Sequence, residues 1–346
     1  MENKRYDILS LTQQEVEEIV SSLGEPKFRA KQVWGWINKG MWGDEMSNVP
    51  ASLRKKLDDV CEFRLPTVKR KLVSSIDGTV KYLFELIDGE YIESVFMKYE
   101  HGNTLCISSQ VGCRMGCKFC ASTLLGRVRD LLPSEMLGQI IAAEKDTGER
   151  ISNVVMMGIG EPLDNYDNTV KFLRLVSADD GLNIGLRHIS VSTCGLVDKI
   201  DRLAEEGLPI TLSVSLHAYD NEVRSGIMPV NNKYPIEKLL SACNDYFQKT
   251  GRRISFEYTL INGKNDTSEG AARLASILKR YIKGTCHVNL IPLNEVEETK
   301  LQTSKNVNNF KNKLISHGIN ATVRRRLGSD INASCGQLRR QEKKDD

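Results

Sequence analysis

The chain has 346 residues, of which 40% are hydrophobic and 27% charged, and its 48 basic and 45 acidic side chains leave a formal net charge of +3. This composition is typical of a globular protein with a large core, and the charge balance does not by itself indicate a nucleic-acid partner. No apolar run reaches the roughly 18–20 residues that span a bilayer, so we expect no membrane attachment. Nine cysteines, mostly isolated in the sequence, favour the reducing cytoplasm over a secreted disulfide scaffold.

Residues 1–62 are expected to form a small helical accessory domain. Apolar residues recur at helical spacing after Thr12, which can cap the first helix, and Gly24 ends it. A second helix is expected over 28–38 and a third from about Pro50. The three tryptophans of this unit (Trp34, Trp36 and Trp42) are interpreted first as core residues, with exposed recognition as the alternative.

Residues 63–98 change to short alternating strands, which we interpret as a β linker. Asp77-Gly78 and Asp88-Gly89 have the composition of hairpin turns. Glu93 lies in an otherwise apolar strand, where a carboxylate needs either a partner or a chemical role.

From Thr104 onward, short apolar strands alternate with helical stretches, a pattern that indicates a parallel sheet. Strands are expected at 105–109, 153–157, 188–192, 210–216, 254–260, 287–291 and 321–325. Six strand–helix units and a last strand are too few for a closed eight-fold barrel. We therefore expect an α/β fold with an open, partial barrel over 99–331, followed by a C-terminal segment over 332–346.

Three cysteines follow the first of these strands with the spacing C-x3-C-x2-C, at Cys113, Cys117 and Cys120. Three thiolates this close can hold three irons of a cubane iron–sulfur cluster and leave the fourth iron open, whereas an electron-transfer cluster normally has four protein ligands. Structural zinc usually needs four ligands in two close pairs, and the chain has no second close pair. Zinc remains the alternative to a catalytic cluster.

The ends of the later strands carry glycine-rich or polar motifs, where barrel folds collect their sites. Gly160-Glu161 can bind an amino group, because glycine allows close backbone approach and Glu161 can accept a hydrogen bond; a helix N-cap turn is the alternative. Ser192, Ser215 and Asn294 can bind ribose or carboxylate oxygens. His217 is, taken alone, more simply explained as a buried core histidine.

Two solitary cysteines complete the set of candidate residues. Cys106 lies on the first strand of the expected barrel, and Cys335 follows the last strand. A lone cysteine is more often a small buried hydrophobe than a nucleophile, so the sequence alone leaves both alternatives open.

Four motifs together resemble the RlmN group of radical S-adenosylmethionine (SAM) RNA methyltransferases. They are the C-x3-C-x2-C loop, Met-Gly-Ile-Gly-Glu-Pro-Leu, Ser-Leu-His-Ala and Ala-Ser-Cys-Gly-Gln-Leu. The resemblance covers essentially the whole chain. It implies that 1–62 recognises RNA, that 99–331 is a partial (β/α)6 radical SAM barrel, and that 332–346 carries a methyl-carrier cysteine.

The resemblance also implies a role for each candidate residue. Cys113, Cys117 and Cys120 would bind a 4Fe-4S cluster. The SAM site would be formed by Gly160, Glu161, Ser192, Ser215, Leu216, His217 and Asn294. Cys335 would be methylated by one SAM, and a second SAM would generate the radical that activates this methyl group. Glu93 would accept a proton, and Cys106 would form a transient disulfide with Cys335.

The implied reaction is methylation of carbon 2 of an adenosine in 23S rRNA, at the peptidyl transferase centre, and of the adenosine beside the anticodon in some tRNAs. A low-potential electron donor such as flavodoxin or ferredoxin would supply electrons. Two alternatives are kept: a Cfr-type methyltransferase that acts on carbon 8, and a non-enzymatic, zinc-bearing RNA-binding module.

Overall fold

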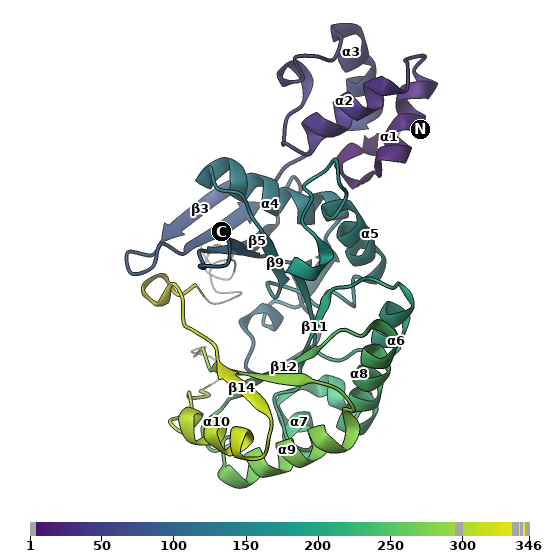
Figure 1. Ribbon diagram of the computed structural model, residues 1–346. Helices are drawn as coiled ribbons and strands as arrows, with labels where there is room; N and C mark the ends of the chain where they lie inside the picture. Colours follow the sequence, from purple (N-terminus) through teal and green to yellow (C-terminus); the bar gives the residue numbers. More distant parts are fainter. Residues whose placement is uncertain (1–4, 295–299, 334–338, 340–341, 343–346) are drawn as a thin grey trace.

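The computed structural model describes residues 5–294, 300–333, 339 and 342. Its N-terminal unit begins with a short strand and contains three helices, and it lies at one end of the molecule (Figure 1). The elements are β1 (Tyr6–Asp7), α1 (Gln13–Ser22), α2 (Phe28–Ile37), α3 (Ala51–Val60) and β2 (Cys61–Glu62). β1 pairs with β2 in parallel, so the first and last strands of the unit lie side by side.

The predicted start of α1 is confirmed in detail. The Glu15 backbone N–H donates to Thr12 Oγ1 at 3.2 Å, and the Thr12 backbone N–H donates to Glu15 Oε2 at 2.6 Å. This capping box satisfies two donors that a helix start otherwise leaves unpaired. Of the three tryptophans, Trp34 is buried, whereas Trp36 and Trp42 are half-buried. The indole N–H groups of the latter two donate hydrogen bonds to Asn48 Oδ1 and Asp58 Oδ1, respectively.

One ten-stranded sheet forms the rest of the framework, in the order β14-β13-β12-β11-β10-β9-β6-β5-β4-β3. The strands from β6 to β14 are parallel, as predicted, and those from β3 to β6 are antiparallel. The bounds are β3 (Thr67–Val73), β4 (Val80–Glu85), β5 (Tyr91–Met97), β6 (Thr104–Cys106), β9 (Asn153–Met156), β10 (Ile189–Thr193), β11 (Thr211–Ser215), β12 (Ile254–Leu260), β13 (Cys286–Pro292) and β14 (Asn320–Val323).

The strands interpreted as a linker are therefore part of the main sheet, which corrects that expectation. β5 pairs with β6 through Val95–Cys106, Phe96–Leu105 and Met97–Thr104. The physical reason is burial: every residue of β5 is buried, as a strand inside a sheet requires and a linker strand does not.

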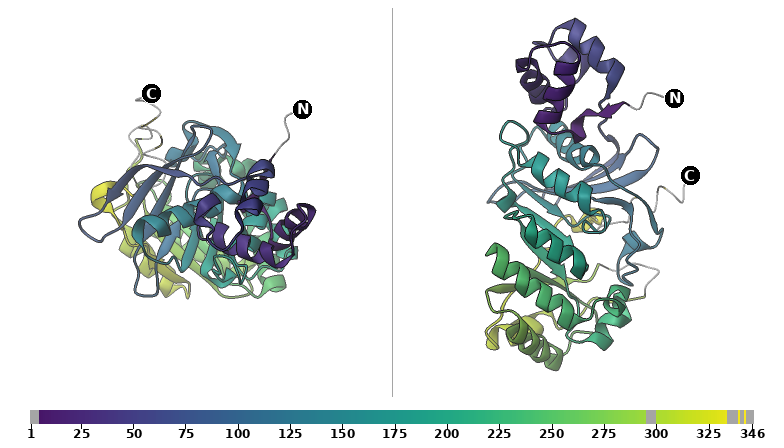
Figure 2. Two further views of the ribbon diagram at one scale, coloured as in Figure 1. Left: turned by 90° about the horizontal axis from the view of Figure 1, so that it is seen from above. Right: turned by 90° about the vertical axis from the view of Figure 1, so that its right-hand side faces the viewer.

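The helices between the parallel strands pack along the outer face of the sheet, and the right-hand view of Figure 2 shows them ranked one above another. They are α4 (Pro133–Thr147), α5 (Tyr166–Val176), α6 (Val197–Glu205), α8 (Ile236–Thr250), α9 (Ser268–Tyr281) and α10 (Val307–Ser316), whereas α7 (Asn221–Ile227) lies at the ends of β10 and β11 beside the cysteine loop. Their apolar sides bury the main core against the strands. No helix among the described residues is both long and apolar enough to span a membrane.

The chain after β14 returns across the sheet to the turn between β3 and β4 (Figure 1). We call residues 324–333 the strap. The Gly328 backbone N–H donates to Asp77 Oδ2 at 2.9 Å, and Ser74 Oγ donates to Asp330 Oδ1 at 2.7 Å. The strap thus connects the two edges of the partial barrel.

Candidate active site

Two adjoining cavities lie on the inner side of the sheet. One, of about 250 Å³, is lined by Cys113, Cys117 and Cys120, and we call it the triplet cavity. The other, of about 460 Å³, is lined by Glu93 and Cys106, and we call it the Cys106 cavity. The two cavities share the lining residues Met157, Gly158, Ile291, Asn294 and Arg324. The sites inferred from strand ends and from solitary residues are therefore neighbours in space.

The cysteine loop is closed at its base by a short antiparallel pair, β7 (Gln110–Gly112) and β8 (Arg127–Asp130). Gly112 has φ +79°, and a Cβ built there would lie 1.8 Å from the carbonyl oxygen of Gly126. Only glycine allows this close approach. The two ends of the loop are held together by a bond from the Cys113 backbone N–H to the same Gly126 oxygen, at 3.0 Å.

The three thiols are suited to a metal cluster by type and surroundings. Cys113 and Cys117 are 7% and 8% exposed, and burial raises the pKa of Cys113 to about 12 and that of the other two thiols as well. Such thiols stay protonated until a metal binds and displaces their protons. Within the described ranges, no group of three or more His, Cys, Asp or Glu side chains is placed to hold a metal ion. By the type and number of its ligands, the three-thiol donor set fits a cluster with one open iron.

The end of β9 forms the edge of the triplet cavity beside these thiols. Gly160 has φ +112°, and a Cβ there would lie 2.7 Å from both the backbone nitrogen and the Cβ of Gln110. At Gly158, a Cβ would lie 2.6 Å from the Ile107 carbonyl oxygen. Both glycines are therefore required for the tight packing of β9 against the start of the cysteine loop.

Glu161 is 4% exposed and joins two strand ends. Its Oε2 accepts from the Cys194 backbone N–H at 2.7 Å, and its Oε1 accepts from the Leu163 backbone N–H at 3.1 Å. Burial raises the pKa of Glu161, although these hydrogen bonds act in the opposite direction. The carboxylate lines the triplet cavity and, with two acceptor oxygens, can still receive a bond from an amino group.

His217 lines the same cavity in a left-handed backbone conformation, with φ +54°. Its Nδ1 accepts from the Thr259 backbone N–H at 2.8 Å, and burial lowers the pKa of the ring to about 3. The imidazole is therefore neutral and carries its proton on Nε2, which makes it a fixed donor in the cavity wall. It is both a buried histidine and a lining residue.

The remaining SAM-site candidates separate into two groups. Ser192, Ser215 and Asn294 line the triplet cavity, and Asn294 also lines the Cys106 cavity. The Leu216 side chain is fully buried in the main core and lines neither cavity; its carbonyl oxygen accepts from Arg224 Nε at 3.1 Å. Any contact of Leu216 with a ligand would have to come from its backbone.

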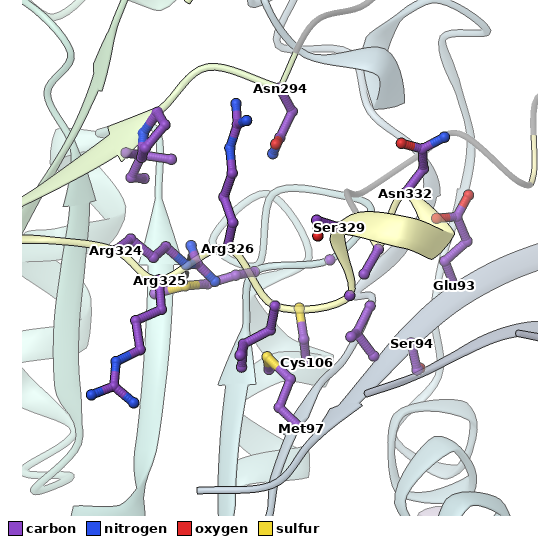
Figure 3. A pocket seen from close by; sticks show the side chains of 18 of the residues that line it. Glu93, Ser94, Met97, Cys106, Asn294, Arg324, Arg325, Arg326, Ser329 and Asn332 are labelled. Carbon is purple, nitrogen blue, oxygen red and sulfur yellow. Dashed lines mark hydrogen bonds between the residues drawn. The ribbon is translucent and has the colours of Figure 1, made fainter. Parts of the chain in front are cut away.

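The Cys106 cavity contains the two candidate residues that precede the cysteine loop (Figure 3). Burial raises the pKa of the Cys106 thiol, and the nearby Arg324 guanidinium acts in the opposite direction. Glu93 is 2% exposed and has the partner that its surroundings require, because its Oε2 lies 3.1 Å from Lys81 Nζ. Cys335 lies outside the described residues, two positions after Ala333, which lines this cavity.

Comparisons with known proteins agree with this geometry over nearly the whole chain. Residues 107–275 match the radical SAM superfamily, and residues 6–63 match the ribosomal RNA large subunit methyltransferase N-terminal domain. A probable dual-specificity RNA methyltransferase RlmN of Clostridium novyi is 52% identical over 338 residues, which are 96% of this chain and 98% of that protein. A protein of the same name from Clostridium perfringens is 53% identical, with 96% of each chain covered. The chain belongs to the RlmN family of radical SAM RNA methyltransferases.

A solved relative extends the RlmN assignment to three dimensions. The crystal structure of a radical SAM methyltransferase from Sphaerobacter thermophilus matches with a TM-score of 0.90 and 41% identity, covering 96% of this chain and 98% of that one. Membership of the radical SAM superfamily implies SAM and a 4Fe-4S cluster as cofactors. The alternative of a non-enzymatic zinc module is rejected.

This RlmN-family site also depends on residues that sequence analysis missed. Arg224 on α7 is fully buried and donates to the carbonyl oxygens of Cys194 (2.7 Å) and Ser215 (3.1 Å). It thereby ties the ends of β10 and β11 together. No local pattern indicates this role, because its partners are distant in sequence.

Glu257 and Arg324 were missed as well. Glu257 on β12 is 4% exposed, lines the triplet cavity and accepts from Asn289 Nδ2 at 2.8 Å. Its strand alternates strictly between apolar and polar residues, and this alternation was an available signal for a polar inner face. Arg324 falls within the strand expected at 321–325 and had no site role in that expectation, yet it lines both cavities.

Substitution of Gly160 by alanine is expected to lower the free energy of unfolding by about 1–3 kcal/mol, because a Cβ there clashes and the backbone is strained. Gly226→Ala is the matched control: it lies in α7 with open space around it and an ordinary φ. Urea unfolding of both variants tests this, and equal midpoints would contradict the packing argument.

Proposed function

We propose that this enzyme methylates carbon 2 of an adenosine in 23S rRNA and, as its relatives' dual-specificity name suggests, of an adenosine in tRNA. The observation that carries the proposal is the placement of Glu93 and Cys106 in one cavity that adjoins the cysteine triplet. A methyltransferase that used SAM for direct displacement needs neither residue.

Carbon 2 of adenine is not nucleophilic, so displacement of a methyl group from SAM cannot reach it. When bound, the cluster and two SAM molecules supply one methyl group and the 5′-deoxyadenosyl radical that activates it. The protein's own contribution is to hold the methyl group covalently and to position the base.

In the proposed reaction, Cys335 carries the methyl group, and its activated carbon adds to carbon 2 of the base. Glu93 then accepts the proton that carbon 2 loses, and the unpaired electron left on the base returns to the redox system that supplied it. The Cys106 thiolate attacks the sulfur of Cys335, which forms a disulfide and breaks the carbon–sulfur bond; the released carbon keeps the bonding electron pair and takes up a proton to become the methyl group. A low-potential donor such as flavodoxin or ferredoxin supplies electrons to the reaction, and reduction of the disulfide by two electrons regenerates the thiols.

The residues around the triplet have binding roles in this proposal. Cys113, Cys117 and Cys120 hold the cluster, and Gly160 and Glu161 bind the amino group of SAM. Other polar groups of the cavity wall bind the rest of SAM, namely Ser192, Ser215, His217 and Asn294, with Leu216 acting through its backbone. The fixed Nε2 donor of His217 suits an acceptor such as the carboxylate or a ribose oxygen.

The proposal divides the chain into an RNA-recognition unit (1–62), the sheet region (63–331) and the carrier segment (332–346). The enzyme is proposed to act in the cytoplasm, where its RNA substrates are. The target base must leave its stack to enter the Cys106 cavity, as bases do in other nucleobase-modifying enzymes.

Mass spectrometry of nucleosides from a strain that lacks this gene tests the proposal. We expect 2-methyladenosine to disappear from 23S rRNA and from tRNA. Loss of 8-methyladenosine instead would support the Cfr-type alternative and contradict the proposal. In the purified enzyme, Cys335→Ala should abolish methyl transfer while the iron content stays unchanged; loss of iron in this variant would contradict the carrier role.

A further inference from the structure

Lys81 is a fully buried lysine on the face of the sheet that the strap covers. It lies on β4, diagonally across from Glu93 on β5, because Lys81 pairs with Val95 and Leu83 pairs with Glu93. Diagonal neighbours on one face are within reach of long side chains. The exposed fractions are 0% for Lys81 and 2% for Glu93.

The ammonium group of Lys81 contacts both the proposed proton acceptor and the strap. Its Nζ lies 3.1 Å from Glu93 Oε2, and it donates to the carbonyl oxygen of Asn332 at 3.0 Å. Asn332 belongs to the strap and precedes Cys335 by three residues. In Figure 3, Glu93 and Asn332 lie beside each other at one side of the Cys106 cavity, while Cys106 lies at another.

Stability alone does not account for an ion pair in this place. Burial of two charges is costly, and apolar residues of similar volume often replace such pairs without loss of stability. The same face is apolar at Leu83 and Tyr91, so an apolar side chain at position 81 would have apolar neighbours on that face. The pair is therefore better explained by what the ammonium does for the carboxylate and the strap.

We propose that Lys81 is a positioning residue that holds the proton-accepting carboxylate of Glu93 and the strap before Cys335 in a fixed relation. This inference rests on the proposed function, because it assumes the roles of Glu93 and Cys335. The ammonium holds the Glu93 carboxylate in place at the wall of the Cys106 cavity. The bond to Asn332 places the start of the carrier segment against the same group.

Other contacts complete the surroundings of Glu93. Its Oε1 accepts from the Arg339 backbone N–H at 2.8 Å, and the Arg339 guanidinium lies 3.5 Å from Glu90. The hydrogen bonds of Asp77 and Asp330 fix the strap at 328–330. Lys81 adds a contact that joins the strap to Glu93, the proposed proton acceptor.

The test compares Lys81→Met and Lys81→Arg with the wild-type enzyme, cluster-loaded and under anaerobic conditions. Formation of 2-methyladenosine in RNA and of a covalent protein–RNA adduct is followed, the latter on denaturing gels. In Lys81→Met, the rate of 2-methyladenosine formation should fall by roughly 100-fold or more, which is the contribution expected of general acid–base catalysis. The covalent protein–RNA adduct should accumulate at the same time, because the proton on carbon 2 is not removed. Lys81→Arg keeps the charge and should restore turnover at least in part.

Lys98→Met is the matched control, because Lys98 follows the same strand as Glu93 but pairs with Glu149 at the surface. It should behave like the wild type. Turnover of Lys81→Met close to that of the wild type would overturn the inference, and so would slower turnover without adduct. If the wild-type enzyme makes no 2-methyladenosine, the proposed function fails instead.

A second measurement covers the case in which Lys81→Met does not fold. The backbone N–H groups of Ile331 and Ala333 both donate to the Gly328 carbonyl oxygen, so their hydrogen exchange reports on the strap. The charge-neutral double variant Lys81→Met/Glu93→Gln should exchange these protons roughly tenfold faster than Glu93→Gln alone, because a bond from a charged donor to Asn332 is lost. Equal exchange in the two variants would overturn the anchoring role.

Discussion

Substitution of Arg224 by methionine is expected to lower the free energy of unfolding by about 2–4 kcal/mol, since it leaves several buried carbonyl groups without donors. The guanidinium of Arg224 donates to the carbonyl oxygens of Leu216, Cys194 and Ser215 and to Asn231 Oδ1, at 2.7–3.1 Å. Methionine fills a similar volume, so the effect is one of hydrogen bonding and not of a cavity. The Arg224 side chain is fully buried, and this burial lowers its pKa.

Urea unfolding followed by circular dichroism measures this effect. Arg174→Met is the matched control, because Arg174 on α5 is 60% exposed and pairs with Glu206 at 2.8 Å. An exposed ion pair contributes at most about 1 kcal/mol, so this control should unfold close to the wild type. Similar midpoints for the two variants would contradict the view that Arg224 supports the strand ends.

Substitution of Cys106 by alanine is expected to stop the reaction after the methyl carbon has joined the RNA. The base is then attached to Cys335, and no second thiol is present to release it. We expect multiple turnover to be lost and a covalent protein–RNA adduct to accumulate, which mass spectrometry of the nuclease-treated protein detects. Cys286→Ala, which changes a partly exposed cysteine at the start of β13 that lines neither cavity, should turn over normally.

The release step should also depend on pH in a defined direction. Burial raises the pKa of the Cys106 thiol, so only a small fraction is thiolate near neutral pH. Because the thiolate is the attacking species, release should speed up as the pH rises. The Arg324 guanidinium favours the thiolate, so Arg324→Met should slow release at a given pH. Normal turnover by Cys106→Ala, or release that slows as the pH rises, would refute the resolving role.

Much of the site could be predicted because each motif follows a strand that periodicity identifies. Parallel strands deliver their carboxyl ends to one edge, so the Gly160-Glu161 turn and His217 were predicted to meet, and both line the triplet cavity. The same reasoning could have identified Lys81, since a lysine in the apolar run of β4 needs a partner as much as Glu93 does.

The parts that could not be predicted depend on contacts between distant residues. The pairing of β5 with β6 makes β3–β5 part of the main sheet, and no local pattern distinguishes this from a separate hairpin. Arg224 reaches carbonyl groups up to 30 positions away, and carbonyl acceptors have no sequence signature. The hydrogen bonds that hold the strap join residues 251 to 256 positions apart in the sequence, and local conformational propensity does not encode such bonds.

The strap has a consequence for the order in which the molecule opens. Loop-closure entropy opposes its docking, since it joins segments at opposite ends of the sheet, and among the described residues it is held to β3, β4 and their turn by a few hydrogen bonds, those of Ser74, Ser75 and Asp77 and that of Lys81. Local opening should therefore detach the strap before any strand of the parallel sheet separates. Such an opening uncovers the face that carries Lys81 and Glu93 and gives a bulky polynucleotide a way in, while the barrel keeps its fold.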